Sequence, residues 1–550
     1  MNRHRVLLAI LSAAFVIMSV TSMRQKSGTC DEIAHHIPAG YSYYQKWDFR
    51  LNPSNPPLSR YIMALPLQFM GLKAPFEDQS WLQAETPTFG QKFFFQYNKG
   101  QSLVILFASR LTMVVVGLIT GFGVYLLAKY IWGVPGGVCA FILYCFSPEI
   151  LAHSTLATTD ITAACTIIFS LFTFFRFLRR PDYWNVFVSA LALGLAQLSK
   201  NTSLVLYPIF VVIAAIEGFG VQRGSRIIRK LLLIFIVSVL VIWAGYGFRM
   251  RPFLSETTQV QDKVEFVQSL GRSIFGAGWN ASIAARVEGW LKKVPLPLTT
   301  YIMGIFGVWK HSSQGHRTFF MGRWSDYGHP LYYAVAFLIK TPIPLIISLL
   351  LAIISLRFRR IKRQEAYILL CAAILFLTAS LNRLQLGIRY ILPVYPLCFI
   401  FISRLVGFLN TKVRRLAASA LLVWLVAIPL VAWPNYLSYF NEFIGGPENG
   451  WKYLRDSNID WGQDLPTLAK YLNNNKINEI ALLYFGEDDP HIYGINFRKL
   501  NEEETKKPTK TAYAISVQYL DWVGWAKNIP PTAKAGYSIF IYDFRAKNGS

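Results

Sequence analysis

Long stretches with almost no charged side chains recur through this chain, and they restrict what it can fold into. An α-helix of about 20 apolar residues crosses the ~30 Å hydrocarbon core of a bilayer with its backbone polar groups hydrogen-bonded internally. About eleven stretches of this kind, including shorter ones, occur at 6–23, 111–128, 130–148, 161–175, 183–199, 203–216, 231–248, 331–356, 366–381, 390–403 and 416–433. The sequence therefore predicts a polytopic α-helical membrane protein.

Basic residues gather between the predicted spans in a pattern that sets the orientation. With a cytoplasmic N-terminus, alternation through the spans brings each basic cluster to the cytoplasmic side, as the positive-inside rule requires. Membrane topology thereby explains the net charge of +25, and no nucleic-acid partner is expected. The clusters are Arg3/Arg5, Arg176/Arg179/Arg180, Arg223/Arg226/Arg229/Lys230, Arg357/Arg359/Arg360/Lys362/Arg363 and Lys412/Arg414/Arg415.

Two long loops and the C-terminal region then lie on the extracytoplasmic side. The loops cover residues 24–101 and 249–330, and the first contains two short amphipathic helices predicted at 31–47 and 58–71. Beyond residue 433, "KINEIALLYFG", "TAYAISVQYL" and "GYSIFIYDF" alternate as strands do, and "QDLPTLAKYLNNN" is typical of a helix. We expect a transmembrane domain over 1–433, with these external loops, and a small extracytoplasmic α/β domain over 434–550.

Acidic and histidine side chains collect at the outer ends of the predicted spans. Asp31, Glu32, His35 and His36 follow the first span, and Asp160 opens the fourth. A carboxylate in such a cluster can accept the proton of an incoming hydroxyl nucleophile. The simpler interpretation is that Asp31 and Glu32 favour a helix N-terminus by their charge and that Asp160 caps a helix. The residues alone leave both interpretations open.

Four blocks of the sequence resemble successive landmarks of one membrane-enzyme superfamily. They are "DEIAHHIPAGYSYYQKWDFRLNPSNPPLSRYIMALPL", "SPEILAHSTLATTDITAACTI", "LALGLAQLSKNTSLVLYP" and "YFNEFIGGPENGWKYLRDSNIDWGQDL". The chain resembles GT-C glycosyltransferases, and within them the bacterial glycosyltransferase 39 or protein-O-mannosyltransferase-like branch, which includes the lipid A aminoarabinose transferase. The chain departs from the eukaryotic protein mannosyltransferases because it lacks their β-trefoil domain between spans, and this difference argues against a protein acceptor.

The resemblance implies an inverting transferase in the bacterial inner membrane. Such an enzyme takes a sugar from a polyprenyl-phosphate carrier and passes it to an extracytoplasmic lipid, glycan or protein. In the family pattern the Asp–Glu pair of the first loop supplies the catalytic carboxylate, which matches Asp31 and Glu32, and the acid that opens the fourth span matches Asp160.

A carrier of this kind needs a cationic site for its phosphate near the outer leaflet. The candidates are Arg389, Arg383, Lys340 and Lys200, and Arg389 is preferred because it precedes an uncharged span on the side with few basic residues. Arginine suits forked contact with phosphate, and lysine acts as a point charge. The alternative is that these side chains extend from span ends towards water.

Metal binding and the C-terminal block also leave alternatives. His35 and His36 are candidates for contact with an acceptor or with a divalent metal, although their spacing matches no standard zinc signature. "DSNIDWGQDL" is suited to sugar binding or, as an alternative that we favour, to docking the external domain.

Two other functional classes compete with a transferase. A transporter or flippase of lipid-linked sugars would carry polar residues in mid-span and broken helices in repeated halves. The acids here gather at one membrane face, and no internal repeat is visible. A non-catalytic membrane scaffold would leave the external acidic cluster unexplained. The sequence thus favours a transferase. It assigns no cofactor to this enzyme, and a divalent metal stays an alternative.

Overall fold

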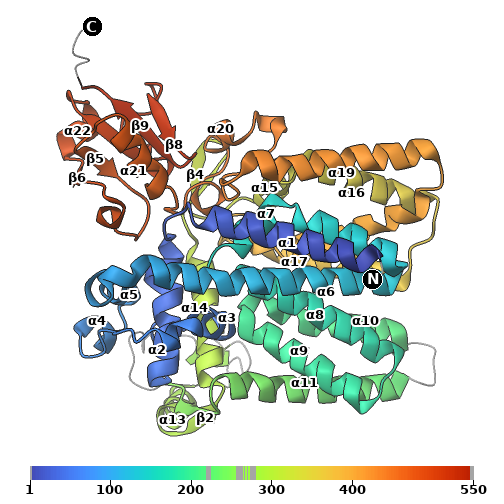
Figure 1. Ribbon diagram of the computed structural model, residues 1–550. Coiled ribbons are helices and arrows are strands. Elements are labelled where there is room, and N and C mark those ends of the chain that lie inside the picture. The colour runs from blue at the N-terminus through green and yellow to red at the C-terminus, as the bar shows by residue number, and fades with distance from the viewer. Residues whose placement is uncertain are drawn as a thin grey trace.

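A bundle of helices forms most of the molecule (Figure 1). The structure is a computed structural model that describes residues 3–218, 224–254, 264, 267–268, 271–272 and 280–545. Arg223 of one basic cluster lies outside these residues. The apolar helices are α1 (Arg3–Met23), α6 (Ser102–Cys145), α8 (Asp160–Arg179), α9 (Tyr183–Ser199), α10 (Leu206–Gly218), α11 (Gly224–Gly245), α15 (Tyr332–Lys340), α16 (Ile343–Ile354), α17 (Arg363–Ser380), α18 (Val394–Ile402) and α19 (Lys412–Ala432).

Helix α6 contains two of the predicted spans. Its helical backbone is interrupted at Gly133, where φ is 75°, a value that glycine adopts without strain. The Tyr144 hydroxyl donates a hydrogen bond to the Gly117 carbonyl at 2.6 Å, and the rings of Phe122 and Phe141 stack with centroids 5.3 Å apart. In a straight helix Gly117 and Tyr144 would be about 40 Å apart. The chain therefore turns back at Gly133, and α6 consists of two antiparallel arms.

By length and composition alone, seven helices of the described residues can cross a membrane, or up to eight if a bent pair counts as one span. The bent pair is α15 with α16 and its continuation to Arg357, at an angle of 113°. That count is lower than the predicted number because it takes α6 once and omits two shorter apolar helices, Tyr183–Ser199 and Val394–Phe408. Most residues of every predicted stretch nevertheless lie on helices, and the stretch at 331–356 is divided between the two helices of the bent pair. The chain is a multi-pass membrane protein.

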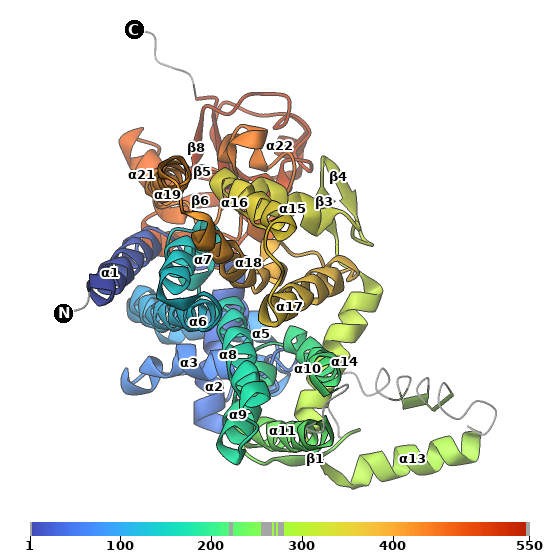
Figure 2. The ribbon, with the colours of Figure 1, turned by 90° about the vertical axis from the view of Figure 1, so that its right-hand side faces the viewer.

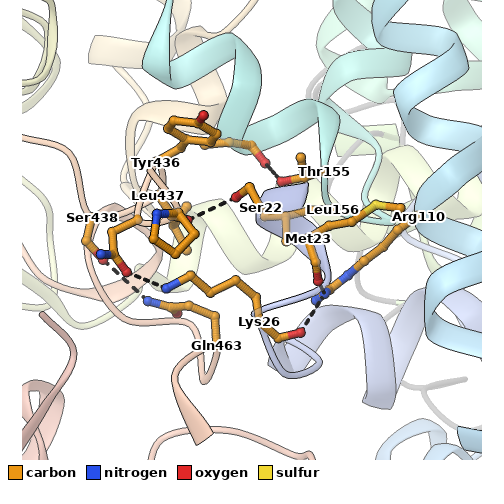
Figure 3. Close-up of a pocket in the computed structure, with 13 residues that line it drawn as sticks. Ser22, Met23, Lys26, Arg110, Thr155, Leu156, Tyr436, Leu437, Ser438 and Gln463 are labelled. Carbon is orange, nitrogen blue, oxygen red and sulfur yellow. Dashed lines mark hydrogen bonds between the residues drawn. The ribbon is translucent and has the colours of Figure 1, made fainter. Parts of the chain in front are cut away.

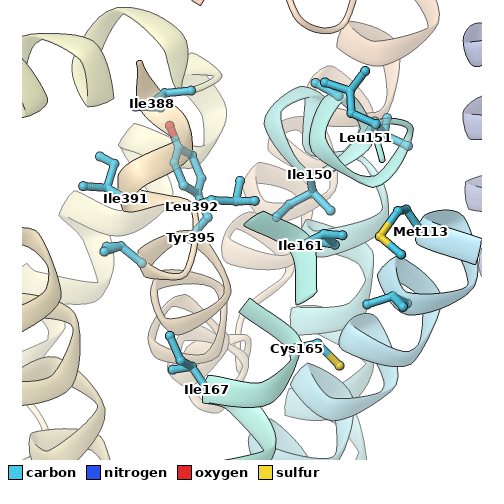
Figure 4. Packing of buried hydrophobic residues seen from close by; sticks show 14 of the residues in the cluster. Met113, Ile150, Leu151, Ile161, Cys165, Ile167, Ile388, Ile391, Leu392 and Tyr395 are labelled. Atoms are coloured by element: carbon cyan, nitrogen blue, oxygen red, sulfur yellow. The ribbon is translucent and has the colours of Figure 1, made fainter. Parts of the chain in front are cut away.

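The interior of the bundle is apolar and joins helices that are distant in sequence. Figure 4 shows Met113 of α6, Ile161 and Cys165 of α8, and Leu392 and Tyr395 around the start of α18, with Ile388 and Ile391 in the turn before it. These side chains are almost fully buried. This packing places the start of α8 and the turn before α18 in one part of the molecule.

The first external loop folds into short helices at one end of the bundle. A π-helical turn (Glu32–His36) leads into α2 (Ile37–Lys46), and α3 (Leu58–Ala64) follows. The helices predicted at 31–47 and 58–71 therefore form, the second only in part. Two further short helices, α4 (Gln79–Leu82) and α5 (Thr86–Gln91), return the chain to α6. Between the end of α6 and the start of α8 the chain forms α7 (Pro148–Ser154).

The other long loop combines helices with two small two-stranded sheets. Strand β1 (Met250–Pro252) pairs with β2 (Pro295–Pro297), and β3 (Thr318–Phe320) pairs with β4 (Arg323–Ser325), both antiparallel. Helix α13 (Ala281–Lys293) stands away from the bundle beside α11, as Figure 2 shows, and α14 (Thr299–Gln314) runs alongside the first loop.

The C-terminal region forms the predicted α/β fold. Its mixed sheet has the order β6-β5-β7-β9-β8. Strand β5 is parallel to β6 and β7, whereas β9 is antiparallel to β7 and β8. Helix α21 packs the leucines of "LPTLAKYL" against one face of this sheet. The remaining bounds are α20 (Pro447–Gly450), α21 (Leu465–Asn474), β5 (Ile480–Leu483), β6 (Phe497–Lys499), α22 (Glu502–Lys506), β7 (Ala512–Ser516), β8 (Ala533–Ala535) and β9 (Ile539–Asp543).

The two ends of the bundle differ in character. The sheet region and the first loop lie at one end, and α1 begins at the other (Figure 1). At that second end a cavity of about 870 Å³ is lined mainly by apolar side chains, together with Arg3 and Arg414, and one of the apolar residues is Phe358, which lies between Arg357 and Arg359. Three of the predicted basic clusters are therefore neighbours there, opposite the acidic cluster.

Candidate active site

Asp31 lies directly before the π-helical turn and forms an ion pair with Arg389. The Arg389 Nη1 atom donates to Asp31 Oδ2 at 2.7 Å, and the Asp31 side chain is 22% exposed. The carboxylate makes no capping hydrogen bond to the turn. Burial alone would raise the pKa of Asp31, but Arg389 and the neighbouring histidines outweigh it, and the pKa is lowered. The observed geometry thus favours a charged partner for Asp31 over a capping role.

Arg389 is held in a short turn between α17 and α18. Its Nε atom donates to the Leu386 carbonyl at 3.1 Å, and its guanidinium lies 4.2 Å from the centre of the Trp461 ring. Burial opposes the charge of Arg389, yet Asp31 and Asp160 raise its pKa. A forked cation is therefore fixed beside Asp31 by a residue of the C-terminal block.

A second ion pair lies beside the first. At the start of α8, Asp160 Oδ1 is 2.6 Å from Lys200 Nζ, which follows the end of α9. Thr158 donates to the other Asp160 oxygen at 3.1 Å. The Tyr390 ring contacts both cations, since Lys200 Nζ lies 4.5 Å and Arg389 Cζ 5.6 Å from its centre. Asp31, Asp160, Lys200 and Arg389 thus form one cluster around Tyr390.

Glu32 lies next to Asp31 in a different environment. Its side chain is fully buried, with Arg110 Nη2 2.6 Å from Oε2 and Arg110 Nε 2.8 Å from Oε1. It also accepts hydrogen bonds from the backbone N–H groups of Thr29 and Ala157. Burial alone would raise the pKa of Glu32, but Arg110 and these N–H groups outweigh burial, and the pKa is lowered. Glu32 therefore joins the first loop to α6 and to the segment before α8.

The two histidines of the first loop point to different neighbours. His36 is buried, with Nδ1 3.1 Å from Arg60 Nη2 and Nε2 4.0 Å from Asp31 Oδ2. Burial and Arg60 lower the pKa of His36 to about 3, so that its ring is neutral at pH 7. His35 is partly exposed and lines a separate cavity. Among the described residues, no three His, Cys, Asp or Glu side chains are grouped so that they could hold a metal ion.

The other cations predicted to bind phosphate lie apart from this cluster. Lys340 is fully buried and donates to the carbonyls of Leu437, Tyr439 and Asn458 at 3.0, 3.1 and 2.6 Å. Its Nζ also lies 3.3 Å from Glu149 Oε1. Arg383 is exposed and donates to the Ser313 carbonyl at 3.1 Å.

Several residues that matter here were not predicted from the sequence. Glu149 and His153 are fully buried on α7 behind the cluster, with Glu149 Oε2 3.9 Å from His153 Nε2. Arg110 and Trp461 contact Glu32 and Arg389. The sequence did contain signals: Glu149 and His153 lie shortly before Asp160, and Arg110 lies at the edge of the apolar stretch 111–128. The partners of Glu149 and Arg110 are distant in sequence, however, and no local pattern indicates them.

The C-terminal block docks on the first loop. Backbone hydrogen bonds join Ser27 N to Gln463 O and Cys30 N to Trp461 O, both at 3.0 Å. Figure 3 shows the adjoining contacts around Lys26, Arg110 and Gln463. The cavity there is only about 20 Å³, enough for about one water molecule. This part of "DSNIDWGQDL" is therefore arranged for docking, the alternative favoured from the sequence.

Comparison with known proteins identifies the fold. Residues 101–244 match the family model described as dolichyl-phosphate-mannose-protein mannosyltransferase. The apo structure of ArnT from Cupriavidus metallidurans matches with a TM-score of 0.50 and 11% identity over 98% of this chain and 97% of that chain. The chain has the GT-C fold. The resemblance to GT-C glycosyltransferases predicted from the sequence is thus confirmed.

Two further structures resemble this GT-C chain more loosely. ArnT from Cupriavidus metallidurans bound to undecaprenyl phosphate gives a TM-score of 0.48 at 12% identity, covering 99% of both chains. AglB, the oligosaccharyltransferase of Archaeoglobus fulgidus, in complex with an inhibitory peptide and a dolichol-phosphate, gives 0.45 at 15% identity over 86% of this chain and 58% of that chain. No curated protein sequence gives a significant match.

Proposed function

We propose that this protein is a membrane glycosyltransferase that moves a sugar from a polyprenyl-phosphate carrier to an acceptor hydroxyl. The GT-C fold supports this proposal, as does the matching family, whose description names a dolichyl-phosphate sugar. The orientation predicted from the basic clusters would place the reaction on the extracytoplasmic side of a bacterial inner membrane. Residues 1–433 would be the catalytic transmembrane domain and 434–550 an extracytoplasmic domain.

One observation carries the proposal: a carboxylate and a forked cation meet 2.7 Å apart at Asp31 and Arg389, with a second cation, Lys200, across the Tyr390 ring. A transferase of this class needs a base for the acceptor and positive charge for the departing phosphate. Both functions are provided by side chains of one cluster at one end of the bundle. Glu32 and Lys340, which are fully buried and multiply bonded, serve the fold in this proposal.

The reaction step assigns one role to each member of the pair. The acceptor hydroxyl gives its proton to the Asp31 carboxylate while its oxygen bonds to the anomeric carbon. The bond between that carbon and the phosphate oxygen breaks, and its electron pair leaves with the polyprenyl phosphate, whose negative charge increases by one. Attack opposite the departing oxygen inverts the anomeric configuration. Arg389 stabilises the departing phosphate, with Lys200 as the second cation.

The ion pair also couples the two roles. Arg389 lowers the pKa of Asp31. A carrier phosphate that takes up the contacts of Arg389 weakens this effect, because the guanidinium charge is then shared with the phosphate. Asp31 therefore becomes a stronger base when the donor is bound. Asp160 holds Lys200 at 2.6 Å and so positions the second cation.

Arg389 provides the test of this proposal. In nanodiscs containing the full chain, Arg389→Ala should raise the apparent KM for a polyprenyl-phosphate sugar at least tenfold, because a charge-assisted contact of about 1.5–3 kcal/mol is lost. Arg389→Lys should recover only part of the affinity, since the forked geometry is missing. Arg323→Ala, an exposed arginine on β4, is the matched control. A wild-type donor titration for Arg389→Ala would move the phosphate site elsewhere.

A further inference from the structure

A polar cavity lies against the first loop, and His35 of the π-helical turn is among the residues that line it. Its volume is about 630 Å³, within the range of sites that hold small molecules. The walls come from residues 48–54 and 82–86 of the first loop, residues 251–253 after α11, and one side of α14. All of these segments lie outside the apolar helices.

Positive charge dominates the wall of this cavity. Arg50, Arg251 and Lys310 line it, and among the described residues of the wall Asp48 is the one acid. Asp48 is already paired with Arg50, since Arg50 Nε lies 2.8 Å from Asp48 Oδ2. Among the ion pairs of the described residues, none involves Arg251. The cavity thus offers a cation whose charge no carboxylate of the described chain neutralises.

The remaining wall has the features of a carbohydrate site. Phe49, Phe253 and Phe306 contribute aromatic surface, and Asn52, Thr300 and Gln314 contribute groups that donate and accept hydrogen bonds. Aromatic faces with a few placed polar groups suit the apolar and polar faces of a sugar ring. The Asn52 Oδ1 atom already accepts from Asn55, but a wholly apolar ligand would offer no partner to Thr300 and Gln314.

His35 connects the cavity with the reacting carboxylate. It lines the cavity and lies four residues after Asp31 in the π-helical turn. Its ring is close enough to Asp31 to contribute to lowering the pKa of that carboxyl, after Arg389 and His36. An acceptor seated in the cavity would therefore reach Asp31 past His35.

We propose that this cavity binds the acceptor, and that the acceptor is an anionic carbohydrate carrying a phosphate or carboxylate group. The negative group pairs with Arg251, and the sugar rings lie against the aromatic wall. The inference rests on the proposed transferase function, which it extends by naming the acceptor site and its chemical class. An acidic group suits an arginine with no internal partner because the pairing is charge-assisted and forked.

The test measures binding without any transfer. Full-length protein in nanodiscs of a zwitterionic lipid is titrated with maltotriose carrying one phosphate and with uncharged maltotriose, and binding is followed by thermophoresis. The phosphorylated probe should bind at least tenfold more tightly, and higher salt should weaken it. Arg251→Gln should remove this preference. Arg286→Gln, an exposed arginine on neighbouring α13, is the matched control and should leave it intact.

The outcomes separate this inference from the transferase proposal. Equal binding of the two probes, binding of neither, or an unchanged preference in Arg251→Gln would overturn the anionic acceptor site. Binding of a polyprenyl-phosphate sugar, measured without acceptor, should be the same for Arg251→Gln and the wild type, because Arg251 does not belong to the cluster around Tyr390. Weaker donor binding by this variant would instead place the cavity on the donor side and overturn the assignment. Failure of the wild type to use any polyprenyl-phosphate sugar would refute the proposed transferase function itself.

Discussion

Two adjacent acids of the first loop show how strongly the surroundings decide the role of a residue. Asp31 keeps 22% of its side chain exposed and meets one cation, Arg389. Glu32 is fully buried and accepts hydrogen bonds from Arg110, from the nearby Thr29 N–H and from the distant Ala157 N–H. A base must reach a substrate, whereas a structural ion pair must be closed to solvent. The pair therefore divides into a candidate base and a structural anchor.

Glu32→Gln should destabilise the protein by about 3–5 kcal/mol, because it leaves the Arg110 guanidinium buried without its counter-charge. Thermal unfolding in detergent, compared with Asp31→Asn, measures this difference. Asp31→Asn should unfold close to the wild-type temperature, since Asp31 is partly exposed. Equal loss of stability in both variants would contradict the division of roles.

Asn458 of the C-terminal block joins this block to α15 and to the turn before α18. Lys340, at the end of α15, donates to the Asn458 carbonyl at 2.6 Å. The Asn458 amide oxygen accepts from Ile388 N at 3.0 Å, and its amide nitrogen donates to the Tyr332 hydroxyl at 2.9 Å. Ile388 directly precedes Arg389. The C-terminal block thus positions the turn that carries the candidate phosphate ligand.

Asn458→Ala should raise the apparent donor KM about tenfold, because the Ile388 N–H loses its buried acceptor and the turn shifts. The matched control is Asn449→Ala, which removes an amide of the same block that contacts only nearby residues of that block. A merely structural role would lower the amount of folded protein and leave the donor KM of the surviving fraction unchanged. That result would contradict positioning of Arg389 by Asn458.

The sequence predicts where helices and strands form better than it predicts which residues form contacts between them. Apolar stretches and alternating strands are local patterns, and the helices and the sheet follow them. The pairing of Asp31 with Arg389 joins residues 358 positions apart, and no local pattern contains it. Lys200 was predicted as a phosphate ligand, but its pairing with Asp160 was not. The inward turn of Arg110 also depends on Glu32, which comes 78 residues earlier.

For the molecule as a whole, the separation of charge predicts how it sits in the membrane. The acidic cluster and the sheet region lie at one end, and Arg3 and Arg414 line a cavity at the other. Reporter fusions at Asn410 and after residue 550 are separated by α19 and should report opposite compartments, with Asn410 cytoplasmic. A reversed assignment, or the same compartment for both, would contradict the orientation.

The central claim is that Asp31 acts as the base in transfer from a polyprenyl-phosphate sugar. The most direct measurement follows release of polyprenyl phosphate from a labelled donor by purified protein in nanodiscs, with a cell-envelope extract as the source of acceptor. The wild type should release the carrier as labelled sugar enters the extract. Asp31→Asn, whose amide cannot take the proton, should lower the rate by a factor of at least about 100 while it remains folded. Near-normal turnover by Asp31→Asn would contradict the account.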